Sequence, residues 1–168
     1  MKAVRKAIMI LAFLAVSLFG TALYAQVAED GYNVKEETIE KNGRQIDVLA
    51  SEDGYVRITQ PAKINMYTFE GKVYLVGETK AGTKINIFVY NAKASEYSGT
   101  ATETYELKPV GASCTFSQVL EFPEGSNKIV LHYLNEDSNI ENKMVFYINR
   151  ESQETQDALS SYITMPGK

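Results

Sequence analysis

The sequence predicts an all-β protein built as an antiparallel β-sandwich, and three observations support this fold class. Five short segments between Lys72 and Arg150 alternate apolar and polar side chains, which is typical of strands with one face on a core. Gly, Pro, Asn and Asp separate these segments and favour turns. No stretch before Glu151 shows the 3.6-residue apolar spacing of an amphipathic helix.

Residues 26–59 predict an N-terminal β-hairpin extension. Asn42-Gly43 is the strongest hairpin signal, because a two-residue primed turn needs positive φ at both positions and these residues tolerate it. In that register Ile39 lies opposite Ile46. A second turn signal follows at Asp53-Gly54. The segment has few apolar residues, so we expect it to lean on the main domain, since an isolated hairpin is marginally stable.

Residues 60–150 form the predicted sandwich domain, where the alternating segments are denser and more apolar. The alternation is clearest in residues 84–90, 129–134 and 144–148, and shorter segments bring the expected total to about six or seven strands. One set of alternate residues in the three clearest segments is apolar throughout and is predicted to face the core: Ile85, Ile87, Val89, Ile129, Leu131, Tyr133, Met144, Phe146 and Ile148.

Residues 1–25 predict a secretory signal peptide. The first six residues carry three positive charges, an uncharged apolar run extends from Ala7 to Phe19, and Ala25 suits the position before a cleavage site. A retained signal anchor is the alternative, because residues 7–25 approach the length of about 20 that a membrane span needs. Gly20 and Thr21 interrupt the run and favour cleavage. We therefore expect a protein secreted to the extracellular space or cell envelope, and the short leader is typical of bacteria.

Charge and cysteine content narrow the class of partner. Without the leader the chain has 14 Lys and Arg against 21 Asp and Glu, a net charge of −7. Nucleic acid and anionic lipid are therefore disfavoured, because both need clustered cations. Cys114 is the single cysteine, so the exported chain must be stabilised by its apolar core. We expect Cys114 to lie buried and inert on a strand, since no cationic residue adjoins it.

Residues 151–168 form a polar tail. Ala158, Leu159 and Tyr162 have helical spacing, but the segment is too short to predict a stable helix by itself. We expect a frayed turn or a flexible tail that ends at Pro166-Gly167.

Turn and core motifs in four segments resemble those of bacterial immunoglobulin-like domains: Val76–Thr79, Gly82–Ile87, Thr115–Ser117 and Glu124–Leu131. The resemblance covers residues 58–150. It implies an immunoglobulin-like antiparallel β-sandwich and a role as an accessory module of secreted surface proteins or glycan-active enzymes, without a common catalytic residue. The motif set occurs once, which disfavours a spacer stalk made of tandem repeats.

The sequence contains no pattern that predicts catalysis, a metal site or a cofactor. His132 is the single histidine and lies in mid-strand, and no paired Cys, zinc-type spacing or glycine-rich phosphate loop occurs. We therefore expect a protein that is not an enzyme and binds no cofactor or metal. Two alternatives remain: a hydrolase whose carboxylates converge from separate strands, and a sandwich-type protease inhibitor that acts through the long loop Ala92–Thr104.

The strand alternation also predicts an apolar outer face. In an immunoglobulin-like sandwich the third, sixth and seventh strands share one sheet, so the residues between the inward-facing ones point outward: Phe88, Tyr90, Val130, His132, Leu134, Val145 and Tyr147. A contiguous apolar face of this size generally marks a contact.

Two interpretations of this face stay open. In the first, the N-terminal segment from Val34 to Ile58 covers it. In the second, it is a docking surface for a protein or polysaccharide, with Phe88, Tyr90, His132 and Tyr147 as binding residues, since tyrosine rings offer contact area at a low entropic cost. The predicted function is thus a secreted or cell-envelope immunoglobulin-like binding module without catalytic activity.

Overall fold

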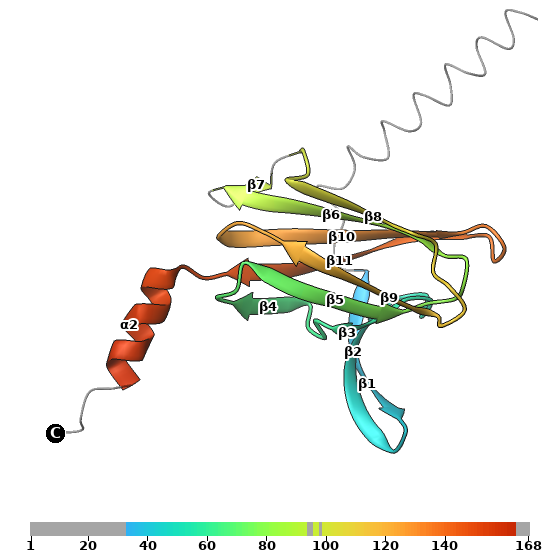
Figure 1. Cartoon of the computed structure of the whole chain (residues 1–168), viewed down its shortest axis with the longest axis horizontal. Helices are drawn as coiled ribbons and strands as arrows, with labels where there is room; N and C mark the ends of the chain where they lie inside the picture. The colour runs from blue at the N-terminus through green and yellow to red at the C-terminus, as the bar shows by residue number, and fades with distance from the viewer. Residues whose placement is uncertain (1–32, 94–95, 98, 164–168) are drawn as a thin grey trace, which may run out of the picture. The chain divides into compact units, whose positions relative to one another are not determined.

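The computed structural model describes residues 33–93, 96–97 and 99–163 (Figure 1). The predicted signal peptide lies outside the described residues. No helix in the described ranges is long and apolar enough to cross a membrane. The described residues form eleven strands and one helix: β1 Val34–Lys41, β2 Arg44–Ser51, β3 Arg57–Gln60, β4 Asn65–Thr68, β5 Lys72–Glu78, β6 Lys84–Lys93, β7 Glu96–Tyr97, β8 Glu103–Leu107, β9 Thr115–Glu121, β10 Gly125–Asn135, β11 Ile140–Arg150 and α2 Gln153–Ile163.

The strands form two sheets that pack as a sandwich (Figure 1). Sheet A has the order β1-β2-β3-β5-β9. Sheet B has the order β4-β11-β10-β6, with β7 and β8 both paired to β6. The β4–β11 pair is parallel and the other described pairs are antiparallel. The predicted all-β class is confirmed, and the arrangement is compatible with an immunoglobulin-like sandwich.

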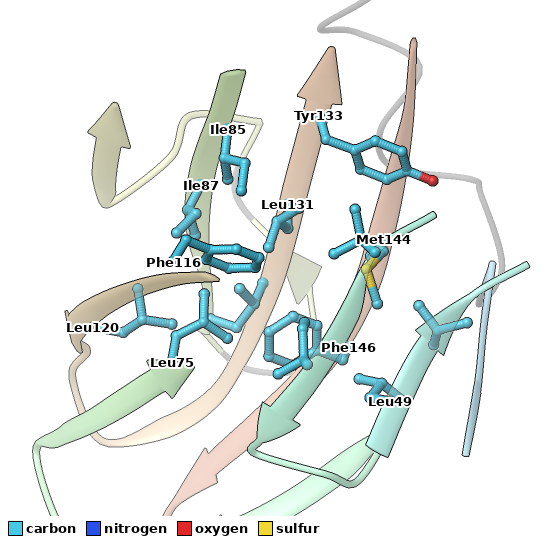
Figure 2. Packing of buried hydrophobic residues seen from close by; sticks show 14 of the residues in the cluster. Leu49, Leu75, Ile85, Ile87, Phe116, Leu120, Leu131, Tyr133, Met144 and Phe146 are labelled. Atoms are coloured by element: carbon cyan, nitrogen blue, oxygen red, sulfur yellow. The ribbon is translucent and has the colours of Figure 1, made fainter. Parts of the chain in front are cut away.

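The core lies between the two sheets and contains every residue that the alternation placed inward. All nine predicted inward-facing side chains of β6, β10 and β11 belong to the buried cluster. Figure 2 shows Leu131, Met144 and Phe146 among them, together with Leu75 and Leu120 from sheet A. The prediction is confirmed because successive side chains of a strand point to opposite faces, so one buried residue fixes the side of its neighbours.

The predicted turns are also confirmed. Asn42 and Gly43 have φ values of 55° and 72°, and Ile39 lies opposite Ile46 in the β1–β2 register. Gly54 has a φ of 67°, as a turn after β2 requires. The hairpin geometry is therefore set by local turn chemistry.

The N-terminal segment contributes more to the core than its composition indicates. β2 pairs with β3, and β3 pairs with β5, so the β1–β2 hairpin extends sheet A. Leu49, Val56 and Ile58 are fully buried. The interpretation that residues 34–58 cover the outer face of sheet B is therefore wrong. The β1–β2 hairpin is followed in the chain by β3, which belongs to sheet A. The hairpin therefore joins sheet A, the layer opposite to sheet B.

The chain changes sheets between β3 and β4. Pro61 follows β3 directly, and proline has no N–H to continue the β3 ladder. The next strand, β4, lies beside β11 in sheet B, where the Tyr147 N–H donates to the Ile64 carbonyl over 2.7 Å. This crossing places β4 at the edge of sheet B.

Cys114 does not lie buried on a strand, and that prediction is wrong. The residue is exposed and precedes β9 in a turn closed by its own N–H, which donates to the Gly111 carbonyl over 3.0 Å. Its φ of 57° is incompatible with an extended strand. The strand itself begins one residue later, at Thr115.

The tail also differs from the prediction of a frayed turn, because residues 153–163 form the helix α2. Ser152 caps its first turn: the Thr155 N–H donates to the Ser152 Oγ over 3.2 Å. A serine at this position satisfies one of the free N–H groups at a helix start. Glu154 adds a favourable negative charge in the first turn.

Candidate functional site

The four predicted binding residues share the outer face of sheet B. In the β6–β10–β11 register, Tyr90 and Tyr147 both lie opposite Lys128, so these three residues form one row across the sheet. Phe88 pairs with Val130 in the next row, and His132 lies one row further along β10. The strand pairing therefore brings the predicted residues together on one surface, while their role in binding stays a prediction.

The centre of this outer face is buried. Val130 and Val145 are 3% and 1% exposed, and Tyr90 is 7% exposed. Tyr147 is half-buried. A partner that docks on this conformation would reach the half-buried Tyr147 and Phe88 but little of Tyr90.

Two tyrosines and two asparagines alternate at the β4–β11 edge of the outer face. The parallel register places Asn65 beside Tyr147 and Tyr67 beside Asn149. Between them, the paired residues Met66 and Ile148 pack on the core, so the other four side chains point outward. We call Asn65, Tyr67, Tyr147 and Asn149 the Asn–Tyr patch.

Tyr67 is the most accessible member of the Asn–Tyr patch. It is 69% exposed, and the other exposed large apolar side chains among the described residues are Tyr74 and Leu159. Residues 65–68 are too few to show the period of two that predicts a strand, and a parallel pairing with β11 has no local signature. Tyr67, Asn65 and Asn149 were therefore missed.

The His132 side chain contacts the Glu141 carboxylate on the neighbouring strand. Its Nε2 lies 3.1 Å from the Glu141 Oε1 across the β10–β11 pair, and its side chain is 27% exposed. The imidazole thus takes part in a surface contact between two strands, and the described contacts bring no hydroxyl or thiol to it. The geometry supports a contact role on the sheet face.

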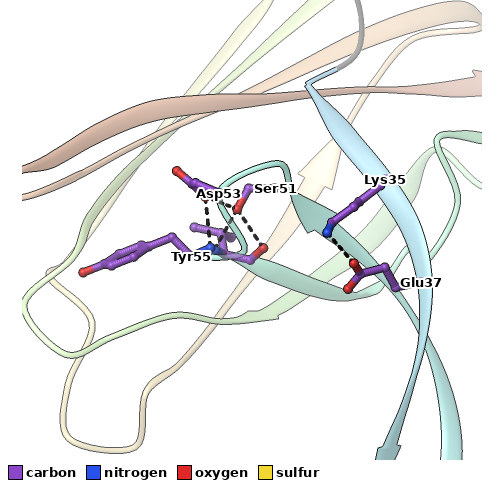
Figure 3. Close-up of polar contacts among 6 residues, drawn as sticks. Lys35, Glu37, Ser51, Asp53 and Tyr55 are labelled. Carbon is purple, nitrogen blue, oxygen red and sulfur yellow. Dashed lines mark hydrogen bonds and ion pairs between the residues drawn. The ribbon is translucent and has the colours of Figure 1, made fainter.

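Among the described residues, Asp53 is the carboxylate that accepts the most hydrogen bonds. Its Oδ1 accepts hydrogen bonds from the Ser51 Oγ (2.6 Å) and the Tyr55 N–H (2.9 Å) (Figure 3). Its Oδ2 accepts from the Tyr133 hydroxyl (2.7 Å) and the Asn142 amide (3.1 Å). The cluster ties the turn after β2 to β10 and β11.

The electrostatics of this cluster favour a structural role. Partial burial acts to raise the pKa of Asp53, but the donors, led by Ser51 and Tyr133, outweigh it and lower the pKa below 3.8. Burial raises the pKa of the Tyr133 hydroxyl. A carboxylate with a lowered pKa is a weaker base, and the four hydrogen bonds of Asp53 stabilise the contact between the turn after β2 and strands β10 and β11.

Strands occupy parts of the long loop proposed for an inhibitor: β6 extends to Lys93, β7 covers Glu96–Tyr97 and β8 begins at Glu103. β8 pairs with β6, and the Tyr105 hydroxyl accepts the Glu121 N–H of β9 over 2.9 Å, which closes one side of the sandwich. Ala94, Ser95 and Ser98 lie outside the described residues, so the inhibitor loop stays a prediction. Within the described ranges, no group of three or more His, Cys, Asp or Glu side chains is arranged to hold a metal ion.

Fold and surface together define a protein of the antiparallel β-sandwich class with an aromatic and amide patch on one sheet edge. No protein-family model matches the chain, and no curated protein matches it. The similarity to bacterial immunoglobulin-like domains therefore remains a resemblance in turns and core.

Proposed function

We propose that this protein is an exported binding module without catalytic activity, and that it contacts a protein or polysaccharide of the cell envelope through the Asn–Tyr patch. The observation that carries the proposal is the 69% exposure of Tyr67 on the same sheet face as the half-buried Tyr147, which pairs with Asn65. Tyrosine is enriched at recognition surfaces, and its ring offers a large contact area at a low entropic cost.

The chemistry of the patch suits a partner with both apolar faces and hydroxyl or amide groups. A tyrosine ring offers an apolar surface with a polar tip and few rotatable bonds. An asparagine amide both donates and accepts hydrogen bonds. Within the described part of the chain, no side-chain hydrogen bond engages Asn65, Tyr67 or Asn149, so these groups are available to a ligand.

The predicted export and the acidic composition support the same class. A leader of 25 residues would deliver the sandwich to the envelope, and a net charge of −7 without it would repel nucleic acid and anionic lipid. A neutral patch on such a surface favours uncharged polysaccharide or polypeptide partners.

Comparison of two tyrosine variants tests the proposal. The probes are an immobilised array of envelope polysaccharides and a phage-displayed library of random 12-residue peptides, both applied to the chain without residues 1–25. We expect Tyr67→Ala to weaken binding of a selected probe at least about tenfold, and melting temperatures to stay equal. Tyr74→Ala is the matched control, since Tyr74 is 63% exposed on the outer face of sheet A.

Three outcomes would contradict the proposal. These are the absence of a probe that binds, equal affinity of the two variants, or a loss of affinity that only follows loss of fold. Turnover of an applied polysaccharide or peptide would exclude the non-catalytic class.

A further inference from the structure

The backbone of β4 has one side that bonds to β11 and one side that does not. The Tyr147 N–H donates to the Ile64 carbonyl over 2.7 Å, and the Glu151 N–H donates to the Thr68 carbonyl over 2.8 Å. In a parallel ladder the residues that bond to the neighbour alternate along the strand. Residues 64, 66 and 68 therefore face β11, and the N–H and C=O groups of Asn65 and Tyr67 point away from the sheet.

These outward backbone groups are open. β4 ends the strand order of sheet B, and both Asn65 and Tyr67 are exposed. No hydrogen bond among residues 33–93, 96–97 and 99–163 uses their N–H or C=O groups. Asn65 and Tyr67 each present one N–H and one C=O group, and the two residues are two positions apart on the strand edge. An extended polypeptide presents its own N–H and C=O groups on one side with the same two-residue repeat.

The two edges of sheet A, β1 and β9, differ from β4. β1 carries five charged residues among its eight, and charge on an edge strand opposes pairing with another chain. On β9 the Glu121 N–H is already bonded to the Tyr105 hydroxyl. β4 has the sequence Asn-Met-Tyr-Thr, with no charge, proline or glycine to block an added strand.

We propose that the edge of β4 binds an extended polypeptide segment of a partner protein, which adds to sheet B as a further strand. This inference rests on the proposed function and names the class of its ligand. The partner's backbone pairs with Asn65 and Tyr67, and main-chain bonds of this kind give affinity without demanding one sequence. Its side chains on the outer face lie beside Tyr67, where β-branched or aromatic residues pack well against the ring.

A second copy of this chain fits the edge less well than a peptide. A self-pairing of two four-residue strands would bury far less than the roughly 1,200 Å² of a stable dimer. A longer segment of a partner protein can extend beyond the four residues of β4 and bury more surface than a second copy of this strand. Polysaccharide hydroxyls have no fixed alternation that matches the Asn65 and Tyr67 groups.

A proline substitution at one of the outward residues separates backbone from side-chain binding. Asn65→Pro removes an N–H that points away from β11, so the sheet keeps its own bonds, whereas Asn65→Ala changes the same side chain and keeps the N–H. The probe is a synthetic 12-residue peptide selected from the phage-displayed library. Because Asn65 belongs to the Asn–Tyr patch, the comparison is between the two variants: we expect Asn65→Pro to bind at least about tenfold more weakly than Asn65→Ala, both with unchanged circular dichroism.

Amide hydrogen exchange provides a second measurement that needs no variant. We expect saturation with the peptide to slow exchange at the Asn65 and Tyr67 amides at least about tenfold, as a new ladder would require. Equal affinity of the two Asn65 variants, or unchanged exchange at both amides, would overturn strand addition. Sedimentation showing a dimer that Asn65→Pro dissociates would assign the edge to a second copy and overturn it as well.

The two proposals fail separately. If a polysaccharide or peptide binds in a Tyr67-dependent manner while the Asn65 variants behave alike, the Asn–Tyr patch is a binding surface and strand addition is wrong. If no probe depends on Tyr67, the proposed function is wrong and the edge has no ligand of this class.

Discussion

The Tyr133 hydroxyl donates a hydrogen bond of 2.7 Å to the Asp53 carboxylate, which joins β10 of sheet B to the turn that follows β2 of sheet A. The Tyr133 ring is buried and stacks on Tyr55 with the ring centroids 6.1 Å apart. A buried phenol needs a partner for its hydroxyl, and the turn supplies one. The N-terminal hairpin is thereby fixed to the opposite layer of the sandwich.

Loss of the Asp53–Tyr133 bond should destabilise the fold moderately. We expect Asp53→Asn and Tyr133→Phe each to lower the free energy of unfolding by about 1 kcal/mol, since Asp53 is partly exposed and a hydrogen bond contributes about this much. Urea denaturation of both variants and the double variant measures the coupling, which we expect to be at least about 0.5 kcal/mol. Additive effects would show that the bond contributes little. Asp137→Asn, in the exposed β10–β11 turn, is the control and should change nothing.

Asp53 should also make stability fall in acid. The folded state lowers the pKa of this carboxyl below its ordinary 3.8, so its contribution is complete above that value and is lost as the pH falls through the lower folded pKa. We expect urea midpoints measured from about pH 6 to about pH 2.5 to decrease below about pH 4. The same series on Asp53→Asn should be flatter in that window, and parallel curves would assign the acid sensitivity to other carboxyls.

Leu49 tests whether the N-terminal hairpin is part of the domain. It is fully buried on β2, so Leu49→Ala should lower the free energy of unfolding by about 2–4 kcal/mol through lost burial and a cavity. Ile46 lies on the same strand nearer the hairpin tip and is half-buried, and Ile46→Ala should cost about 1 kcal/mol or less. A single cooperative transition is expected for both. An equal, small effect would mean that residues 34–51 are an appendage.

Gly77 is required by close packing within sheet A. A Cβ at this position would lie 2.8 Å from the Arg57 carbonyl oxygen and would also collide with the Phe116 ring. We expect Gly77→Ala to reduce the free energy of unfolding by about 2 kcal/mol or more, because neither the backbone nor the packed ring has space to move. Gly111→Ala, where no atom lies within 4 Å, should differ from the unmodified chain by less than about 0.5 kcal/mol.

The Cys114 thiol should react under native conditions. It is exposed in the turn before β9, so a thiol reagent such as dithionitrobenzoate should label it completely without denaturant. Cys114→Ser should leave the melting temperature unchanged, because the thiol makes only a weak 3.8 Å contact with the Ala112 carbonyl. Labelling that requires urea would place the thiol in the core instead.

The strand faces were determined by the sequence itself. Alternation in residues 84–90, 129–134 and 144–148 placed nine side chains in the core correctly, because the period of two is a property of the extended backbone. The turns at Asn42-Gly43 and Asp53-Gly54 were equally local, since positive φ depends on the residues in the turn. Gly54 has a φ of 67°.

The pairing of strands that are far apart in the sequence was decided only by the tertiary structure. The sheet that receives the hairpin depends on β3 pairing with β5, and the Asn–Tyr patch exists because β4 lies parallel to β11. Residues 65–68 are too few to show a period, and their partner is about 80 residues away in the sequence. Alternation fixes the face of a strand but not its neighbour, because long-range pairing is selected by the packing of both sheets together. The candidate binding surface therefore appeared only when the sandwich was assembled.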